Sequence, residues 1–191
     1  MKGIHRKTVF YISCACQLLV ILTLILMYYR NVEGSEQIYR FKCNEEYPFH
    51  YHSKRFTRLN LDIKNVPYEK YTGKKKLMRG MIVYCTFRDI HGYHQIDSIS
   101  TKRPHRGEPF MKTRVQSVSD ETIRLEINFN RYPLSRDRLQ RDAVSKARRR
   151  IVRDGTVVIL DARISKRGTV YARNLYAGDM LIENYIHKYI W

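Results

Sequence analysis

Two hydrophobic patterns divide this chain. Residues 8–29 contain no charged side chain and are almost continuously apolar, whereas the residues that follow mostly alternate between apolar and polar. A run of about 20 apolar residues is long enough to cross the hydrocarbon core of a bilayer as a helix. Alternation with a period of two is typical of strands that bury one face. We therefore expect a single transmembrane helix over residues 8–29, followed by a β-rich domain.

Basic residues beside the apolar segment predict its orientation. Lys2, Arg6 and Lys7 precede the segment, whereas only Arg30 follows it closely. Basic residues near a membrane helix favour the cytoplasmic side. We therefore expect residues 1–7 to lie in the cytoplasm and the C-terminal domain to lie outside it.

The segment boundaries follow from the same pattern. Residues 30–37 read as a short polar linker, and residues 38–191 as the extracytoplasmic β-rich domain. A cleaved secretory signal is the alternative interpretation of residues 8–29. However, the apolar stretch is longer than the usual signal core of about 7–15 residues, and no small-x-small cleavage site follows it. Both features favour a retained anchor.

Nine stretches of the domain alternate apolar and polar positions and are bounded by Gly, Pro, Asp or Ser, which is typical of strands joined by turns. They are residues 37–43, 55–63, 80–87, 93–100, 110–118, 122–129, 156–164, 169–176 and 180–190. In the clearest of them, "TIRLEINF", Ile123 and Leu125 face away from Arg124. This alternation predicts an antiparallel sheet with one buried face.

Residues 135–151 have a helical period instead. Leu139, Ala143, Ala147 and Ile151 recur at every fourth position, and basic residues occupy the opposite surface. The arginines at the end of the segment complement the negative pole of a helix dipole. We therefore predict one amphipathic helix packed on a sheet. The expected fold class is α+β, mostly antiparallel β, preceded by a single N-terminal transmembrane helix.

Two of the predicted hairpins have similar spacing. Each turn ends in a glycine, Gly92 or Gly168, and apolar residues lie nine positions before and seven positions after it. Glycine adopts a positive φ at little steric cost, which suits tight turns. The similarity suggests two β units, at about residues 38–130 and 152–191, joined by the predicted helix. Evenly spaced hairpins of any all-β domain are the alternative explanation.

A nonamer in the second alternating stretch matches a known motif in part. Residues 54–62, "KRFTRLNLD", resemble the signature GDYxxLxxD of a bacterial family of membrane-anchored proteins. Phe56 stands at the tyrosine position, Leu59 at the leucine and Asp62 at the final aspartate. We expect Phe56 and Leu59 to fill core or interface space, and Asp62 to hydrogen-bond the turn that follows.

The resemblance extends along most of the chain. Residues 39–48, 127–144 and 157–181 are similar to the family's first strand, its aromatic stretch before a helix and its closing hairpin. The chain departs from the signature at Lys54 and Arg55, which replace the glycine and the first aspartate, so any contact built on that acid is in doubt. The resemblance implies a bacterial inner-membrane protein with a small periplasmic β-rich domain. Such proteins are functionally uncharacterised and are often encoded beside polytopic membrane proteins.

Candidates for a disulfide or a metal site are few. Cys43 and Cys85 lie on predicted strands, and a disulfide between them would persist outside the cytoplasm. Two small buried apolar side chains are the alternative. Weak candidates for metal ligands are His50, His52, His91 and His94. No "HExxH" spacing or cysteine pair supports a metal site, and surface histidines are the alternative.

The formal net charge of +18 indicates an acidic partner nearby. The basic clusters are Lys74, Lys75, Lys76, Lys102, Arg103, Arg106, Arg148, Arg149 and Arg150. On a membrane-tethered domain we expect them to contact anionic lipid headgroups or an acidic protein surface, because each nearby cation adds about 1 kcal/mol at a charged membrane. A merely solubilising surface is the alternative.

The sequence contains no Gly-rich phosphate loop, paired-carboxylate site or dinucleotide fingerprint, so we predict no catalytic residue and no cofactor. An accessory or interaction protein that supports a polytopic membrane partner is the expected function. One alternative is a membrane-bound hydrolase distantly like type I signal peptidases, although Ser145 and Lys146 are neighbours on a helix, where side chains diverge. The other is a membrane-tethered basic domain that binds nucleic acid.

Overall fold

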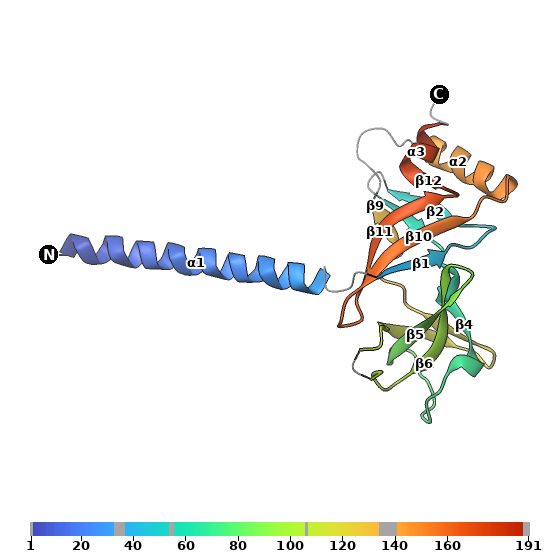
Figure 1. Cartoon of the computed structure of the whole chain (residues 1–191), viewed down its shortest axis with the longest axis horizontal. Helices are drawn as coiled ribbons and strands as arrows, with labels where there is room; N and C mark the ends of the chain where they lie inside the picture. The colour runs from blue at the N-terminus through green and yellow to red at the C-terminus, as the bar shows by residue number, and fades with distance from the viewer. Residues whose placement is uncertain (1, 33–36, 54–55, 106, 134–140, 189–191) are drawn as a thin grey trace. The chain divides into compact units, whose positions relative to one another are not determined.

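The computed structural model describes residues 2–32, 37–53, 56–105, 107–133 and 141–188. The chain divides into two compact units, Met1–Gly34 and Ser35–Trp191 (Figure 1). The first unit is a helix and the second is built mostly of antiparallel strands, so the predicted fold class is confirmed.

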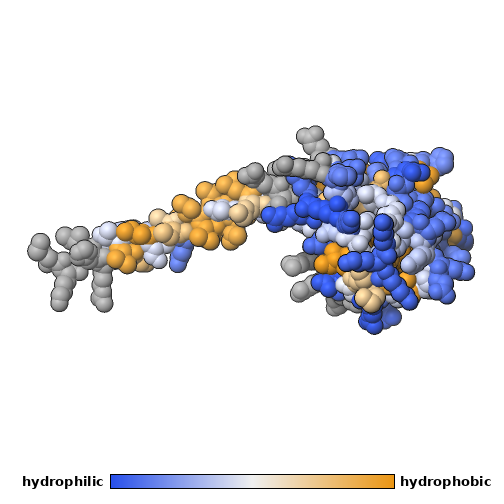
Figure 2. Space-filling view, turned by 90° about the horizontal axis from the view of Figure 1, so that it is seen from below, coloured by the Kyte–Doolittle hydropathy of each residue, from blue (hydrophilic) through white to orange (hydrophobic). Residues whose placement is uncertain are grey.

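The first unit consists of helix α1 (Lys2–Val32). Its stretch Thr8–Tyr29 is the one helix among the described residues that is long and apolar enough to cross a membrane. Apolar side chains cover much of α1, whereas the face of the β-rich unit seen in the same view is largely hydrophilic (Figure 2). Two aromatic pairs stand at the ends of the stretch, as is typical of membrane interfaces: Phe10 with Tyr11, and Tyr28 with Tyr29.

The described part of the second unit contains three antiparallel sheets. One has the order β1 (Ile38–Lys42), β10 (Val158–Ile164), β11 (Val170–Ala177) and β12 (Met180–Leu181). Another has the order β2 (Phe49–Ser53), β3 (Phe56–Leu59) and β9 (Arg131–Pro133). The third has the order β4 (Asn65–Pro67), β8 (Thr122–Leu125), β7 (Met111–Val118), β5 (Ile82–Ile90) and β6 (Tyr93–Ser100). The 3₁₀ turns η1 (Asp62–Lys64) and η2 (Tyr68–Lys70) lie on either side of β4.

Aromatic side chains of β1 join the sheets into one core. Tyr39 and Phe41 alternate with exposed residues along β1 and are themselves buried. The Phe41 ring lies 5.3 Å from Phe87 of β5 and 5.6 Å from Phe129, which follows β8. Tyr39 also lies 5.7 Å from Phe87. Burying large rings at these tilted geometries is strongly favourable, so β1 connects its own sheet to the five-stranded one.

Helix α2 (Arg141–Arg153) packs on β2 and on helix α3 (Ile182–His187), and these elements gather at one end of the unit (Figure 1). The apolar stripe expected from the four-residue period is confirmed, because its members in α2 are buried: Ala143, Val144, Ala147 and Ile151. The helix ends two residues beyond the predicted limit. The start of the prediction, with Leu139, lies outside the described residues.

The prediction of a strand over residues 180–190 is wrong for residues 182–188, and residues 189–190 lie outside the described part of the chain. β12 spans only Met180–Leu181, and α3 follows directly. Ile182 and Ile186 are four residues apart and are 0% and 1% exposed, so both lie on the buried face of the helix. A short apolar run fits the period of a strand as well as that of a helix, so the pattern of residues 180–190 did not distinguish the two.

The two similar hairpins share an irregularity in the structure. β6 and β11 each contain one unpaired extra residue, Asp97 and Arg173, five positions beyond Gly92 and Gly168. The predicted boundary between two β units is not reproduced, however. β1 belongs to the predicted first unit but pairs with β10, a strand of the second.

We expect Gly168→Ala to destabilise the protein more than Gly92→Ala. The two glycines have nearly equal φ values of +82° and +83°, so alanine costs roughly 1–2 kcal/mol at either position. A Cβ at Gly168 would also lie 2.5 Å from the Phe110 ring, whereas nothing lies within 4 Å of a Cβ at Gly92. The clash should add about 1–3 kcal/mol to the loss.

Chemical denaturation of the full-length variants in detergent measures this difference. Gly92→Ala is the matched control for the backbone cost alone. Equal losses for the two variants would contradict the packing of Phe110 on the β10–β11 turn.

Candidate functional site

A cleft of about 460 Å³ is lined by the η1–β4 segment on one side and by the end of the β5–β6 hairpin on the other. It brings together Lys42, Asp62, Lys70 and two of the candidate histidines, His91 and His94. Lys42 forms an ion pair with Glu45 at 2.5 Å, and Lys70 Nζ donates a hydrogen bond to the Ile96 carbonyl. Both lysines of the cleft therefore already have partners.

The signature residues take different positions around β3. Leu59 is 3% exposed and belongs to the core, as expected. Phe56 lies on the opposite face of β3, only partly buried, with the Arg131 guanidinium 5.4 Å from its ring. Asp62 begins η1 and lines the cleft, and its expected hydrogen bond to the following turn stays a prediction. Partial burial raises the pKa of Asp62, while Lys42 opposes the rise.

The histidines do not converge on a metal site. His94 Nδ1 accepts a hydrogen bond from the Arg40 backbone N–H at 3.2 Å, and its ring lies 4.8 Å from Tyr39. His91 is exposed at the β5–β6 turn, and His50 of β2 lies 6.0 Å from the Tyr47 ring. The described residues contain no group of three or more His, Cys, Asp or Glu side chains that could hold a metal ion. The His52 side chain lies outside the described part of the chain.

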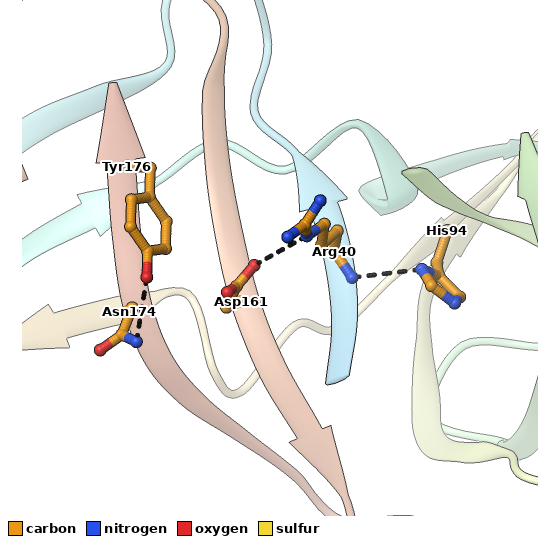
Figure 3. Close-up of polar contacts among 5 residues, drawn as sticks. All are labelled: Arg40, His94, Asp161, Asn174 and Tyr176. Carbon is orange, nitrogen blue, oxygen red and sulfur yellow. Dashed lines mark hydrogen bonds and ion pairs between the residues drawn. The ribbon is translucent and has the colours of Figure 1, made fainter. Parts of the chain in front are cut away.

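Polar side chains form a row from β6 through β1 and β10 to β11 (Figure 3). Arg40 and Asp161 are directly opposite in register, with Arg40 Nε 3.6 Å from Asp161 Oδ1. Asn174 is opposite Asp161 on the other side, and its amide donates a hydrogen bond to the Tyr176 hydroxyl at 3.2 Å. Together with the Arg40–His94 bond, these contacts involve residues of four strands, and Asp161 and Asn174 are related by register alone.

Asp161 is the least expected member of this row. It is 7% exposed, and its Oδ1 is buried without a hydrogen-bond donor among the described residues. Burial raises the pKa of its carboxyl, and Arg40 and Arg173 oppose the rise. A buried acceptor without a donor costs roughly 1–3 kcal/mol. The sequence analysis missed Asp161, although an acid inside the apolar run "VVILDARI" is a readable signal.

The candidate disulfide between Cys43 and Cys85 is not formed, because both residues are free thiols. They are 1% and 0% exposed, and burial raises the pKa of Cys43 and raises that of Cys85 to about 12. Each thiol therefore stays protonated and packs as a small apolar side chain. This is the alternative that the sequence left open.

The predicted basic clusters lie on three separate segments. Lys74, Lys75 and Lys76 are exposed before β5. The loop before β7 carries Lys102 and Arg103, whose guanidinium lies 5.1 Å from the Phe110 ring. On α2, the Arg148 guanidinium lies 4.3 Å from the Tyr47 ring, Arg149 is exposed, and Arg150 pairs with Asp154. Arg106 lies outside the described residues. Several of these arginines thus pack within the domain.

We expect Asp161→Asn to stabilise the protein at pH 7. The raised pKa means that the ionised carboxyl is less favourable in the folded state than in the unfolded one. An asparagine of the same shape removes this penalty. Because a protonated Asp161 is also neutral, the difference should shrink as the pH falls below the raised pKa of the folded state and vanish below the ordinary carboxyl pKa of the unfolded state.

The measurement is chemical denaturation at pH 7 and at acidic pH. Asp97→Asn is the matched control, since Asp97 is more exposed and pairs with Arg88 at 2.8 Å. It should lose up to about 1 kcal/mol. An Asp161→Asn variant that loses as much as the control would contradict the burial argument.

The stability of the protein should fall as the pH decreases below about 6.5, in part because of His94. Burial lowers the pKa of His94, Arg40 adds to this effect, and Asp89 opposes it. The unfolded state therefore takes up a proton first, and stability decreases until the lowered pKa of the folded state is reached. The slope for one such proton is at most about 1.4 kcal/mol per pH unit.

His94→Asn keeps a hydrogen-bond acceptor without a titrating group, so its stability should depend less on pH between about 6.5 and 5. His91→Asn is the control, because His91 is exposed with a φ of 55°, a conformation that asparagine tolerates. Equal pH dependence in the wild type and in His94→Asn would contradict the contribution of His94.

Comparison of this chain with known protein families, with curated proteins and with solved structures finds no match. Its resemblance to the GDYxxLxxD family therefore stays a prediction. The function is argued from the apolar helix, the charge of the β-rich unit and the contacts described above.

Proposed function

We propose that the chain is a single-pass protein of the bacterial inner membrane and that its domain of residues 38–191 is an extracytoplasmic accessory module for a polytopic membrane protein. The observation that carries the proposal is the exposed apolar stretch Thr8–Tyr29 at the start of a chain with 36 Lys and Arg against 18 Asp and Glu. Such a span anchors the chain. The basic excess suits contact with acidic partners at the membrane surface.

The geometry favours an interaction module over a hydrolase. Both cysteines of the β-rich unit are buried, with pKa values raised away from the reactive thiolate. Ser145 is half-buried on α2, whereas the adjacent Lys146 is exposed, so the two side chains point away from each other. This arrangement does not suit a serine nucleophile activated by a lysine base.

The family resemblance implies a polytopic membrane partner. It also implies a periplasmic domain, which argues against binding of nucleic acid. A nucleic-acid surface needs clustered cations with aromatic side chains free to stack on bases. The rings of Phe110 and Tyr47 instead have Arg103 and Arg148 packed on them. The extracytoplasmic orientation proposed here also keeps the domain away from nucleic acid.

A fusion of alkaline phosphatase to the C-terminus is expected to be active, because the enzyme folds only outside the cytoplasm. The matched control moves positive charge across the span, with Lys2, Arg6 and Lys7 changed to glutamine and two lysines inserted after Arg30. This control should lose phosphatase activity, since the basic residues set the orientation. An inactive wild-type fusion beside a fluorescent cytoplasmic reporter fusion would overturn the proposed orientation.

The accessory role predicts that the β-rich domain, and not the apolar helix, selects the partner. Exchanging residues 8–29 for an unrelated apolar span of the same length should leave a polytopic protein co-purifying in mild detergent. Exchanging residues 38–191 for an unrelated soluble domain should abolish this co-purification. The opposite pattern would place partner selection in the helix and contradict the proposal.

A further inference from the structure

A basic groove of about 670 Å³ lies where β3, β9, η1 and the β7–β8 pair meet. Its charged lining residues are Arg58, Lys64, Arg79 and Arg131, with Glu126 as the acid. Four cations against one carboxylate leave a formal excess of three positive charges. None of these residues belongs to the basic clusters expected from the sequence, because the chain brings them together from four separate segments. The volume is within the usual range of about 300–1,000 Å³ for small-molecule sites.

Two arginines of the groove lie directly opposite each other on neighbouring strands, which is unfavourable in a sheet. Arg58 of β3 and Arg131 of β9 are directly opposite in the antiparallel register. Like charges at such positions repel each other and destabilise a sheet. Arg58 Nε is buried and makes no hydrogen bond with any described residue, and the Arg131 guanidinium is stacked on Phe56. The pair therefore costs stability, and both arginines line the same groove.

The positive charge of the groove is not neutralised within the described part of the domain. No carboxylate there forms an ion pair with Arg58, Lys64, Arg79 or Arg131; the ion pairs that do form involve other arginines and lysines. Burial, Arg124 and Arg58 together lower the pKa of Lys64, so a positive field acts at that point. A bound anion would balance the positive charge of the groove.

Backbone contacts hold the groove in place. The β7–β8 pairing is irregular between Val115 and Ser117, so the extra residue Gln116 is directed to the lining. The Arg79–Gly80 turn is fixed on β7, since Gly80 N–H donates to the Val115 carbonyl at 2.8 Å and Val115 N–H donates to the Met81 carbonyl at 2.9 Å. On the other side, Leu59 N–H donates to the Asn130 carbonyl at 2.7 Å. Backbone hydrogen bonds thus fix the segments that carry the basic residues of the groove.

We propose that this groove binds a phosphate-bearing anion with at least two negative charges, held between the paired guanidinium groups of Arg58 and Arg131. Arginine presents a planar fork of donors that matches phosphate oxygens, and two adjacent forks suit one tetrahedral group. A phosphomonoester or a diphosphate carries charge comparable to the excess in the groove, whereas a single carboxylate does not. The shared chemistry is a phosphate group, supplied by a lipid headgroup or by a soluble compound. The site does not depend on the orientation of the chain in the membrane.

Titration of the full-length protein in zwitterionic detergent micelles tests the proposal with two probes. Inorganic pyrophosphate represents a soluble phosphate, and short-chain phosphatidic acid doped into the micelles represents a lipid headgroup. Binding is read by calorimetry and by the rise in melting temperature, and it should weaken with added salt. Binding of pyrophosphate alone identifies a soluble ligand, and binding of phosphatidic acid alone identifies a lipid. Binding of neither probe overturns the proposal.

The double variant R58Q/R131Q should bind whichever probe the wild type binds roughly tenfold more weakly or worse. The control K74Q/K75Q removes the same charge from exposed lysines outside the groove and should stay within about twofold of the wild type. Equal affinity of the wild type and R58Q/R131Q, or an equal loss in the control, overturns the site.

A second measurement separates binding from folding. Without a probe, R58Q/R131Q should melt at or above the temperature of the wild type, because it removes the repulsion between two opposed arginines. A clearly lower melting temperature would show that the arginines stabilise the sheet, and it would overturn the assignment of a ligand site.

Discussion

The burial of Tyr39 and Phe41 against rings of other sheets is the interaction on which the β-rich unit depends. β1 is an edge strand of five residues, yet its inner face contacts Phe87 and, through Phe41, Phe129. Without these contacts the four-stranded and five-stranded sheets would each expose an apolar face. Large rings suit this role because each removes a wide apolar area from water at a small cost in side-chain entropy. The polar row passes through the same strand at Arg40, whose side chain pairs with Asp161 and whose backbone N–H donates to His94.

The periodicity of the sequence predicted the buried faces of individual helices and strands. It did not predict which strands pair when the partners are far apart along the chain. The apolar stripe of α2 and the burial of Ile123, Leu125, Ile127 and Phe129 follow directly from spacing. The short strands β2, β4 and β9 have three to five residues, too few to establish a period. The pairing of β1 with β10 is set by three-dimensional packing, and no local pattern encodes it.

The candidate sites show the same division. A buried acid at position 161 could have been read from the apolar run around it, because a charge inside such a run is unusual. The meeting of Arg58 and Arg131 could not, since it follows from a register between strands more than 70 residues apart in sequence. A buried acid and two opposed arginines both destabilise a fold. Natural proteins retain such destabilising residues mostly at functional sites. The interaction module proposed above satisfies this condition.

The pairing of β1 with β10 also determines when the domain can close during synthesis. Ile38 is opposite Arg163, so 125 residues (163 minus 38) separate the two partners. At ordinary translation rates β1 emerges roughly 6–25 s before β10. Throughout that interval the backbone edge of β1 that pairs with β10 has no partner, a state in which strands readily join foreign chains. The edge of β1 therefore has to be kept from foreign strands until β10 has been synthesised.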